Sequence, residues 1–234
     1  MLGTLVNFFR FIYYSWHDLI VRIASGRSKK FDGYGVYMFV GLPGSGKTIS
    51  VLEYLNRLKK KYGDDLNIYT NFRYSKETAP IRSWRDLIDY SGPAVFVLDE
   101  VQLTFNSRSW KDFPPEMVTL LTQNRKMRKQ IITTSQSFER VDKVFRELVN
   151  YVIECRCIGG RWIFQKWFEK EDYVLGGAND NVRHRRRAKR YNFIATDDLY
   201  NSYDTFLRLD DLKKEEFISR NERLIAELER NGCD

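Results

Sequence analysis

The chain has 234 residues, of which 43% are hydrophobic and 30% charged, and its formal net charge is +8 at pH 7. This length and apolar content fit one α/β domain with extensions, and the basic excess favours acidic partners, either nucleic acid or anionic lipid. Three cysteines exclude an even disulfide framework and a paired metal spacing, so a reducing, cytoplasmic compartment is expected.

The first predicted element is an amphipathic helix over residues 2–24, LGTLVNFFRFIYYSWHDLIVRIA. Its apolar residues share one broad face, and a narrower polar stripe lies opposite. Arg10, His17, Asp18 and Arg22 are too many charges for a membrane span. Two alternatives remain: the helix lies in the interface of an anionic membrane, or it packs on the domain or on a neighbouring subunit.

A phosphate-binding loop follows the apolar run YGVYMFV and precedes a helical pattern that begins near Thr48. The stretch GLPGSGKT matches Gly-x-x-x-x-Gly-Lys-Thr in the strand–loop–helix context that this motif requires. Backbone N–H groups of the loop would surround the phosphates of ATP, Lys47 would reach the β- and γ-phosphates, and Thr48 would bind Mg²⁺. The predicted nucleotide-binding residues are Gly41, Leu42, Pro43, Gly44, Ser45, Gly46, Lys47 and Thr48.

Strands and helices then alternate, which predicts a mainly parallel sheet covered on both faces. The predicted strands are Tyr34–Val40, Leu66–Thr70, Ala94–Asp99, Gln130–Thr134 and Tyr151–Arg156. The helices between them are predicted to begin near Thr48, Ser83, Pro114 and Val141.

A pair of acidic residues, Asp99 and Glu100, follows the apolar run AVFVL. An acid at the carboxyl end of a central parallel strand faces the phosphate loop at the end of a neighbouring strand. Asp99 is therefore predicted to share Mg²⁺ with Thr48, and Glu100 to act as the general base for the attacking water.

Two further candidates surround the strand QIITTSQ. Gln136 at its tip is predicted to sense the γ-phosphate or orient the water, and a plain strand-end cap is the alternative. Arg125, or Arg128, lies near the end of the preceding helix, where a cation complements the helix dipole. Either residue could instead be an arginine finger that reaches the nucleotide of a neighbouring subunit.

After residue 157 the sequence changes character. GGRWIFQKWF predicts a hairpin or edge strand behind a Gly-Gly turn, and GGANDNVRHRRRAKR predicts a mobile basic loop. Seven of the nine residues 182–190 are Arg, Lys or His, which favours contact with the DNA backbone, although lipid head groups or solvent alone are alternatives. The predicted DNA contacts are Arg183, Arg185, Arg186, Arg187, Lys189 and Arg190.

The end of the chain, LDDLKKEEFISRNERLIAELERNG, predicts a charged amphipathic helix. We therefore divide the chain into an N-terminal helix and linker (1–30), a P-loop ATPase core (31–178), and a basic loop with a C-terminal helical extension (179–234).

These motifs together resemble the FtsK–HerA-like motor ATPases and, among them, the zonula-occludens-toxin-like assembly proteins of filamentous phages. The resemblance rests on GLPGSGKT, IYTNF, VLDEVQ, the segment QNRKMRKQIITTSQSFERVDKVFRELVNYVIECR and the closing motif LYNSYDT. It covers about residues 34 to 206.

The resemblance implies a RecA-like, additional-strand P-loop fold, a ring of subunits and a DNA-moving task. Within the family pattern, Arg125 stands at the position of the trans-acting arginine and Gln136 at that of the sensor glutamine. Two departures are Arg128-Lys129, where the family often has glycine, and the lack of a transmembrane helix after the ATPase domain.

Three functions are therefore compared. The leading one is an ATP-hydrolysing motor of phage-like assembly that moves DNA for packaging or extrusion, with virion or channel proteins as further partners. The alternative is a membrane-docked, nucleotide-switched scaffold on the inner face of the host membrane. A small-molecule kinase is disfavoured, because Glu100 beside Asp99 suits the activation of water.

Overall fold

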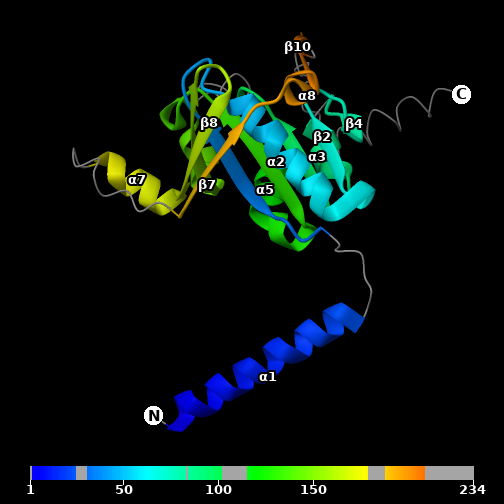
Figure 1. The fold of residues 1–234 in the computed structure, drawn as a ribbon, viewed down its shortest axis with the longest axis vertical. Helices are drawn as coiled ribbons and strands as arrows, with labels where there is room; N and C mark the ends of the chain where they lie inside the picture. Colours follow the sequence, from blue (N-terminus) through cyan, green and yellow to red (C-terminus); the bar gives the residue numbers. More distant parts are fainter. Residues whose placement is uncertain (1, 25–30, 83, 102–114, 179–187, 209–234) are drawn as a thin grey trace, which may run out of the picture.

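The computed structural model describes residues 2–24, 31–82, 84–101, 115–178 and 188–208. Its centre is an eight-stranded sheet in the order β4-β2-β5-β6-β1-β7-β8-β9 (Figure 1). The strands of this sheet are β1 (Gly35–Val40), β2 (Asn67–Thr70), β4 (Ala79–Pro80), β5 (Ala94–Leu98), β6 (Lys129–Ser135), β7 (Val149–Ile158), β8 (Trp162–Glu169) and β9 (Lys189–Ile194). A separate antiparallel pair joins β3 (Phe72–Tyr74) to β10 (Tyr203–Arg208).

The helices are mostly found between the parallel strands, as the alternating sequence pattern predicts. They are α1 (Leu2–Ala24), α2 (Lys47–Tyr62), α3 (Trp84–Asp89), α5 (Pro115–Met127), α6 (Lys143–Leu148), α7 (Lys170–Ala178) and α8 (Asp197–Tyr200), with short 3₁₀ turns at Gly63–Asp65 and Phe138–Arg140.

The strands from β4 to β7 are parallel, and β8 and β9 add to β7 in antiparallel order. The predicted α/β class with a mainly parallel sheet is therefore confirmed. Strand β6 lies between β1, which leads into the phosphate loop, and β5, which leads into the acidic pair. This inserted strand is the additional strand that the resemblance implies.

Each face of the sheet carries its own hydrophobic core. On one face, Val51, Leu52 and Leu55 of α2 are fully buried in a cluster with Phe39 of β1. On the other, residues of α3, α5 and α6 cover alternate residues of the same strands. Met38 of β1 belongs to this second cluster. Because neighbouring residues of one strand face opposite ways, β1 is buried on both sides and its sequence is almost continuously apolar.

Strands β7, β8 and β9 form an antiparallel arm at the flank of the sheet away from β2 and β4 (Figure 1). The predicted hairpin is confirmed: Gly159 and Gly160 have φ angles of 59° and 70° and turn β7 back into β8. The prediction of a basic loop up to residue 190 is wrong at its two ends. Helix α7 extends to Ala178, and Lys189 and Arg190 pair with β8 in strand β9.

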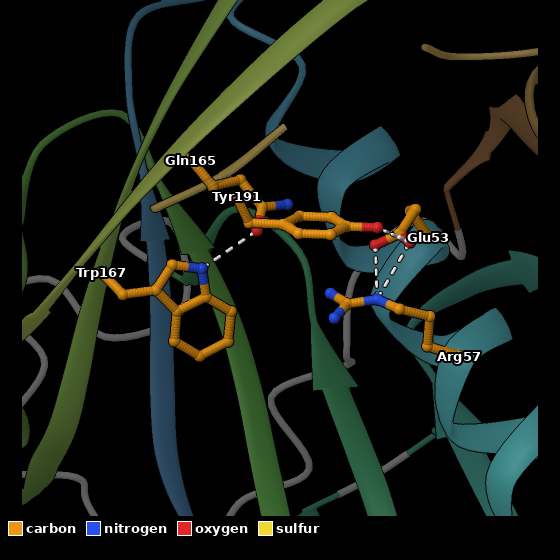
Figure 2. Close-up of polar contacts among 5 residues, drawn as sticks. All are labelled: Glu53, Arg57, Gln165, Trp167 and Tyr191. Carbon is orange, nitrogen blue, oxygen red and sulfur yellow. Dashed lines mark hydrogen bonds and ion pairs between the residues drawn. The ribbon is translucent and has the colours of Figure 1, made fainter. Parts of the chain in front are cut away.

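A polar contact between side chains joins strand β9 to α2 (Figure 2). The Tyr191 hydroxyl donates to a carboxylate oxygen of Glu53 at 2.6 Å, and the Arg57 Nε pairs with the same carboxylate at 2.9 Å. The Arg57 guanidinium also lies over the Tyr191 ring, 4.2 Å from its centre. The arm is thus held to the helix that follows the phosphate loop.

Helix α1 lies apart from the sheet in Figure 1, and its large apolar side chains are exposed wherever they are described. Phe8, Phe11 and Trp16, for example, are 57%, 69% and 62% exposed. Within the described ranges, none of the helices combines the length and apolar character needed to cross a bilayer. The helix predicted near the end of the chain lies in residues 209–234, outside the described residues, and the three-part division of the chain stays a prediction.

Tyr74 of β3 offers a test of this packing. Burial raises its pKa to about 12, and its hydroxyl donates to Asn56 Oδ1 at 2.9 Å. In the unfolded chain the tyrosine pKa is about 10, so the unfolded state loses its proton first. The stabilising effect is therefore complete below about pH 10 and is lost as the pH rises toward 12.

We predict that the free energy of unfolding, measured with urea, declines above about pH 10 and that Tyr74→Phe makes this decline shallower. Tyr13→Phe, at an exposed position of α1, is the matched control and should follow the wild type. An identical decline in Tyr74→Phe and the wild type would contradict the burial of this hydroxyl.

Candidate nucleotide site

The phosphate loop spans residues 41–46 and joins β1 to α2. Gly44 and Gly46 have φ angles of 76° and 79°, a left-handed conformation that glycine adopts without the steric cost of a side chain. A Cβ on Gly46 would also lie 2.8 Å from Cδ1 of Ile163 in strand β8. Two independent constraints, backbone conformation and close packing, therefore require glycine at this position.

Lys47 begins α2 and is 6% exposed. Its Nζ donates to the carbonyl of Leu42 at 3.1 Å, across the mouth of the loop. An ammonium group has three donors, so this position can also serve an anion bound by the loop. The Ser45 hydroxyl is buried and has no hydrogen-bond partner among the described residues. The loop thus contains polar groups, Lys47 Nζ and Ser45 Oγ, whose hydrogen-bonding capacity is not filled by the described residues.

The acidic pair begins where β5 ends, and its first member, Asp99, accepts hydrogen bonds from two neighbouring strand ends. Thr48 Oγ1, at the start of α2, donates to Asp99 Oδ1 at 3.2 Å. Thr134 Oγ1, near the end of β6, donates to the same oxygen at 2.6 Å. The carboxyl ends of three adjacent parallel strands thus bring one carboxylate and two hydroxyls together.

This group of oxygens fits Mg²⁺, which prefers hard oxygen ligands and usually keeps several waters together with substrate phosphates. The structure contains no cluster of three or more His, Cys, Asp or Glu side chains with metal-binding geometry in the ranges it describes. Thr48 and Asp99 are the residues that would hold the ion.

Glu100 has a φ angle of 53°, an uncommon conformation for a residue other than glycine. Its backbone N–H donates to Thr134 Oγ1 at 2.8 Å, so one threonine hydroxyl contacts both members of the acidic pair. Unfavourable backbone angles of this kind cost roughly 1–3 kcal/mol and concentrate at functional sites. The strand end is therefore held in a shape that fixes the positions of Asp99 and Glu100 relative to each other.

Asn71 is a site residue that the sequence analysis did not single out. Its side chain brackets the backbone of Asp99: Asp99 N–H donates to Asn71 Oδ1 at 2.8 Å, and Asn71 Nδ2 donates to the Asp99 carbonyl at 3.2 Å. The sequence feature that could have identified Asn71 is its position in the motif IYTNF, directly after strand β2. Thr134 is the last residue of the predicted strand Gln130–Thr134, and the sequence does not distinguish it from the other polar residues there.

Gln136 lies one residue beyond the end of β6 and accepts a hydrogen bond from Arg140 Nη1 at 2.6 Å. That contact is to a surface side chain, and it leaves the role of Gln136 toward the γ-phosphate a prediction.

Arg125 lies in the last turn of α5, with its guanidinium 5.4 Å from the centre of the Tyr34 ring. Helix α5 leads into the amino end of β6, whereas the phosphate loop lies at the carboxyl end of the parallel strands. The length of β6 separates the two by roughly 20 Å, at about 3.3 Å per residue. Arg125 and Arg128 therefore lie too far away to contact a nucleotide bound by their own phosphate loop, and the arginine-finger role of either residue stays a prediction.

The cysteines near the loop have a packing role. Cys155 of β7 is buried, and its thiol contacts Ser50 Oγ at 3.5 Å. Burial raises the pKa of the Cys155 thiol to about 12, which keeps it protonated and unreactive at neutral pH. Cys157, two residues on, packs against the same core.

Comparison with known families agrees with the motif resemblance. Residues 74–169 match the family model described as Zonular occludens toxin (Zot). The match begins in β3 and ends with β8, and it includes the acidic pair and strand β6. The search of curated proteins found no match.

Solved structures with a similar fold include the N-terminal domain of zonular occludens toxin from Neisseria meningitidis. The similarity has a TM-score of 0.49 and 16% identity, and it covers 74% of this chain and 100% of that one. The genome packaging NTPase B204 from Sulfolobus turreted icosahedral virus 2, in complex with ATP-gammaS, has a TM-score of 0.44 and 14% identity over 51% of this chain and 74% of its own. EccC (ATPases 2 and 3) from Thermomonospora curvata has a TM-score of 0.44 and 12% identity, and the similarity covers 60% of this chain and 36% of that one.

The double contact of Thr134 leads to a prediction. Thr134→Val keeps the shape of the side chain but removes the hydroxyl that contacts Asp99 and Glu100. We expect the rate of ATP hydrolysis to fall about ten- to 100-fold, as when an orienting partner of a catalytic or metal-binding group is lost.

Thr134→Ser restores a hydroxyl at the same position and should stay close to the wild type. If valine is tolerated as well as serine in steady-state turnover, Thr134 does not orient the acidic pair.

Proposed function

We propose that the chain is a Mg²⁺-dependent ATPase that drives DNA movement in phage-like virion assembly. The observation that carries the catalytic part is the single Asp99 carboxylate oxygen that accepts hydrogen bonds from the Thr48 and Thr134 hydroxyls beside the phosphate loop. The match to the Zot family model supports the assembly part.

Each residue has a separate role in the proposed reaction. Backbone N–H groups of the phosphate loop and the Lys47 ammonium bind the phosphates. Thr48 and Asp99 would hold Mg²⁺, and the ion would neutralise the charge that develops on the phosphate oxygens. The Glu100 carboxylate accepts a proton from a water molecule as the water oxygen attacks the γ-phosphorus. The bond to the bridging oxygen breaks, and ADP leaves.

The proposal includes assembly of several copies into a ring. In such a ring, Arg125 would serve a neighbour's site, because it lies at the end of β6 opposite its own phosphate loop. The position of Arg125 in the motif resemblance supports this role. Gln136, at the tip of β6, would then report the state of the γ-phosphate to the subunit that holds it.

DNA is the proposed cargo because the chain carries a formal net charge of +8 and concentrates cations in residues 182–190. Within this tract the structure describes Lys189 and Arg190, whose side chains are exposed on strand β9, and the other cations lie outside the described residues.

A second candidate function is favoured by α1. Its exposed aromatic and aliphatic side chains would suit the interface of an anionic membrane, which would place the protein on the inner face of the host membrane. In this alternative, nucleotide binding would switch a membrane-docked scaffold and no DNA would be moved.

One experiment separates the two: ATP turnover by the purified chain alone, with single- or double-stranded DNA, and with anionic vesicles, at low and moderate salt. We expect several-fold stimulation by DNA that fades as salt rises, because phosphate contacts release counterions. Stimulation by vesicles, without any effect of DNA, would overturn the motor and support the scaffold.

Two variants serve as controls in this experiment. Lys47→Ala should lose nucleotide binding and turnover together. Glu100→Gln should still bind ATP but hydrolyse it poorly, because the amide cannot accept the proton. Full turnover in Lys47→Ala would contradict the assignment of the site.

A further inference from the structure

Part of one face of the antiparallel arm lies outside the hydrophobic cores, beyond the row of Val152 and Phe168, which are buried. In β8 the residues Ile163, Gln165 and Trp167 are buried toward the α2 side, so Trp162 and Lys166 point the other way and are exposed. Residues directly opposite each other in neighbouring strands share a face. The register therefore places three rows on this open face: Ile158, Trp162 and Ile194; Arg156, Phe164 and Asn192; Glu154, Lys166 and Arg190.

The centre of the open face is aromatic. The rings of Trp162 and Phe164 lie 4.7 Å apart at an angle of 40°, and Trp162 is 46% exposed. Trp162 Nε1 donates to Asn192 Oδ1 at 3.2 Å, which fixes the orientation of the indole ring. Ile158 and Ile194 flank it and are 48% and 58% exposed. An exposed apolar patch with an ordered indole ring at its centre is typical of a surface that binds a partner.

Cations lie beside the aromatic pair on the side of Phe164. Arg156 lies opposite Phe164, and Lys166 lies in the next row together with Arg190. These rows thus contain three cations and one carboxylate, that of Glu154. No ion pair of these three cations is found among the described residues. Arg190 also belongs to the basic tract, so the positive charge of that tract continues onto the open face.

Exposed π-surfaces and cations together fit single-stranded nucleic acid, whose bases stack on aromatic rings while its phosphates pair with Lys and Arg. A DNA duplex hides its base faces in the stack and would use the cations alone. We propose that the open face of β7, β8 and β9 is a binding site for single-stranded DNA, with a base stacked on Trp162 and Phe164. This proposal rests on the DNA-moving function and adds to it the form of the strand and the residues that hold it.

The same strands contact the nucleotide loop on their reverse side. Ile163, between Trp162 and Phe164, lies 2.8 Å from the position of a Cβ on Gly46, and the carbonyl of Cys155 lies 2.8 Å from that on Gly41. Tyr191 of β9 is tied through Glu53 to α2 (Figure 2). A shift of the phosphate loop on nucleotide binding would therefore press directly on the strands that carry the proposed DNA site.

The test measures binding by the fluorescence anisotropy of two labelled DNA oligomers of about 20 nucleotides. This length exceeds the site size of typical single-strand binding modules. One is oligothymidylate, and the other has the same sugar–phosphate backbone without bases. The full chain is titrated without nucleotide, so ATPase activity cannot influence the result. Trp162→Leu keeps an apolar side chain but removes the π-surface, and Trp162→Phe keeps a ring.

We expect Trp162→Leu to bind oligothymidylate about ten-fold more weakly than the wild type and to bind the abasic oligomer equally well. Trp162→Phe should retain most of the affinity. Lys166→Gln should weaken both oligomers, whereas Lys143→Gln, at an exposed position of α6 outside the open face, should weaken neither.

The proposal is overturned if Trp162→Leu binds oligothymidylate as the wild type does, or if it weakens both oligomers equally. It is also overturned if the variant changes the oligomeric state and leaves DNA affinity intact, since the face would then be an interface between copies of the chain. Unchanged thermal unfolding and ATP turnover in Trp162→Leu exclude a folding defect. If neither the wild type nor any variant hydrolyses ATP but Trp162→Leu still loses the base-dependent binding, the result contradicts the proposed ATPase function and leaves the DNA site supported.

Discussion

The site depends on one contact, the Asp99 carboxylate oxygen that accepts hydrogen bonds from both Thr48 and Thr134. One hydroxyl comes from the start of α2, which follows β1 and the phosphate loop, and the other comes from the end of β6. The contact therefore exists only while β1, β6 and β5 are adjacent and in parallel register. The inserted strand β6 is what places Thr134 there. The buried cores on both faces of the sheet therefore serve the site directly, because any slip of register would separate these three groups.

A second constraint joins the nucleotide loop to the antiparallel arm. Glycine at positions 41 and 46 lets β7 and β8 approach the loop so closely that a Cβ at either position would meet them at 2.8 Å. The arm is also held to α2 through Tyr191 and Glu53. The loop, the helix behind it and the arm thus form one packed unit, in which the phosphate loop and the proposed DNA site lie on opposite sides of the same strands.

Much of this arrangement could be predicted from the sequence, because it follows from local patterns. The phosphate loop, the apolar strand before Asp99 and the alternation of strands and helices are encoded in short stretches. Asn71 and Thr134 could not be assigned in this way, since their roles depend on strands that are distant in the sequence becoming neighbours. Strand β9 was missed because its Tyr191–Phe193 alternation directly follows a basic run that is typical of a loop. Arg125 was proposed from its position in a motif, and the topology places it at the end of β6 opposite its own phosphate loop.

The central claim is that Asp99, held by these two threonines, is the metal ligand of an ATPase site. The most direct measurement is electron paramagnetic resonance of Mn²⁺, in place of Mg²⁺, with a non-hydrolysable ATP analogue and either the wild type or Asp99→Asn. We expect the substitution to weaken Mn²⁺ binding by at least about ten-fold, while binding of the analogue without metal is retained. Equal Mn²⁺ affinity in the two proteins would contradict it.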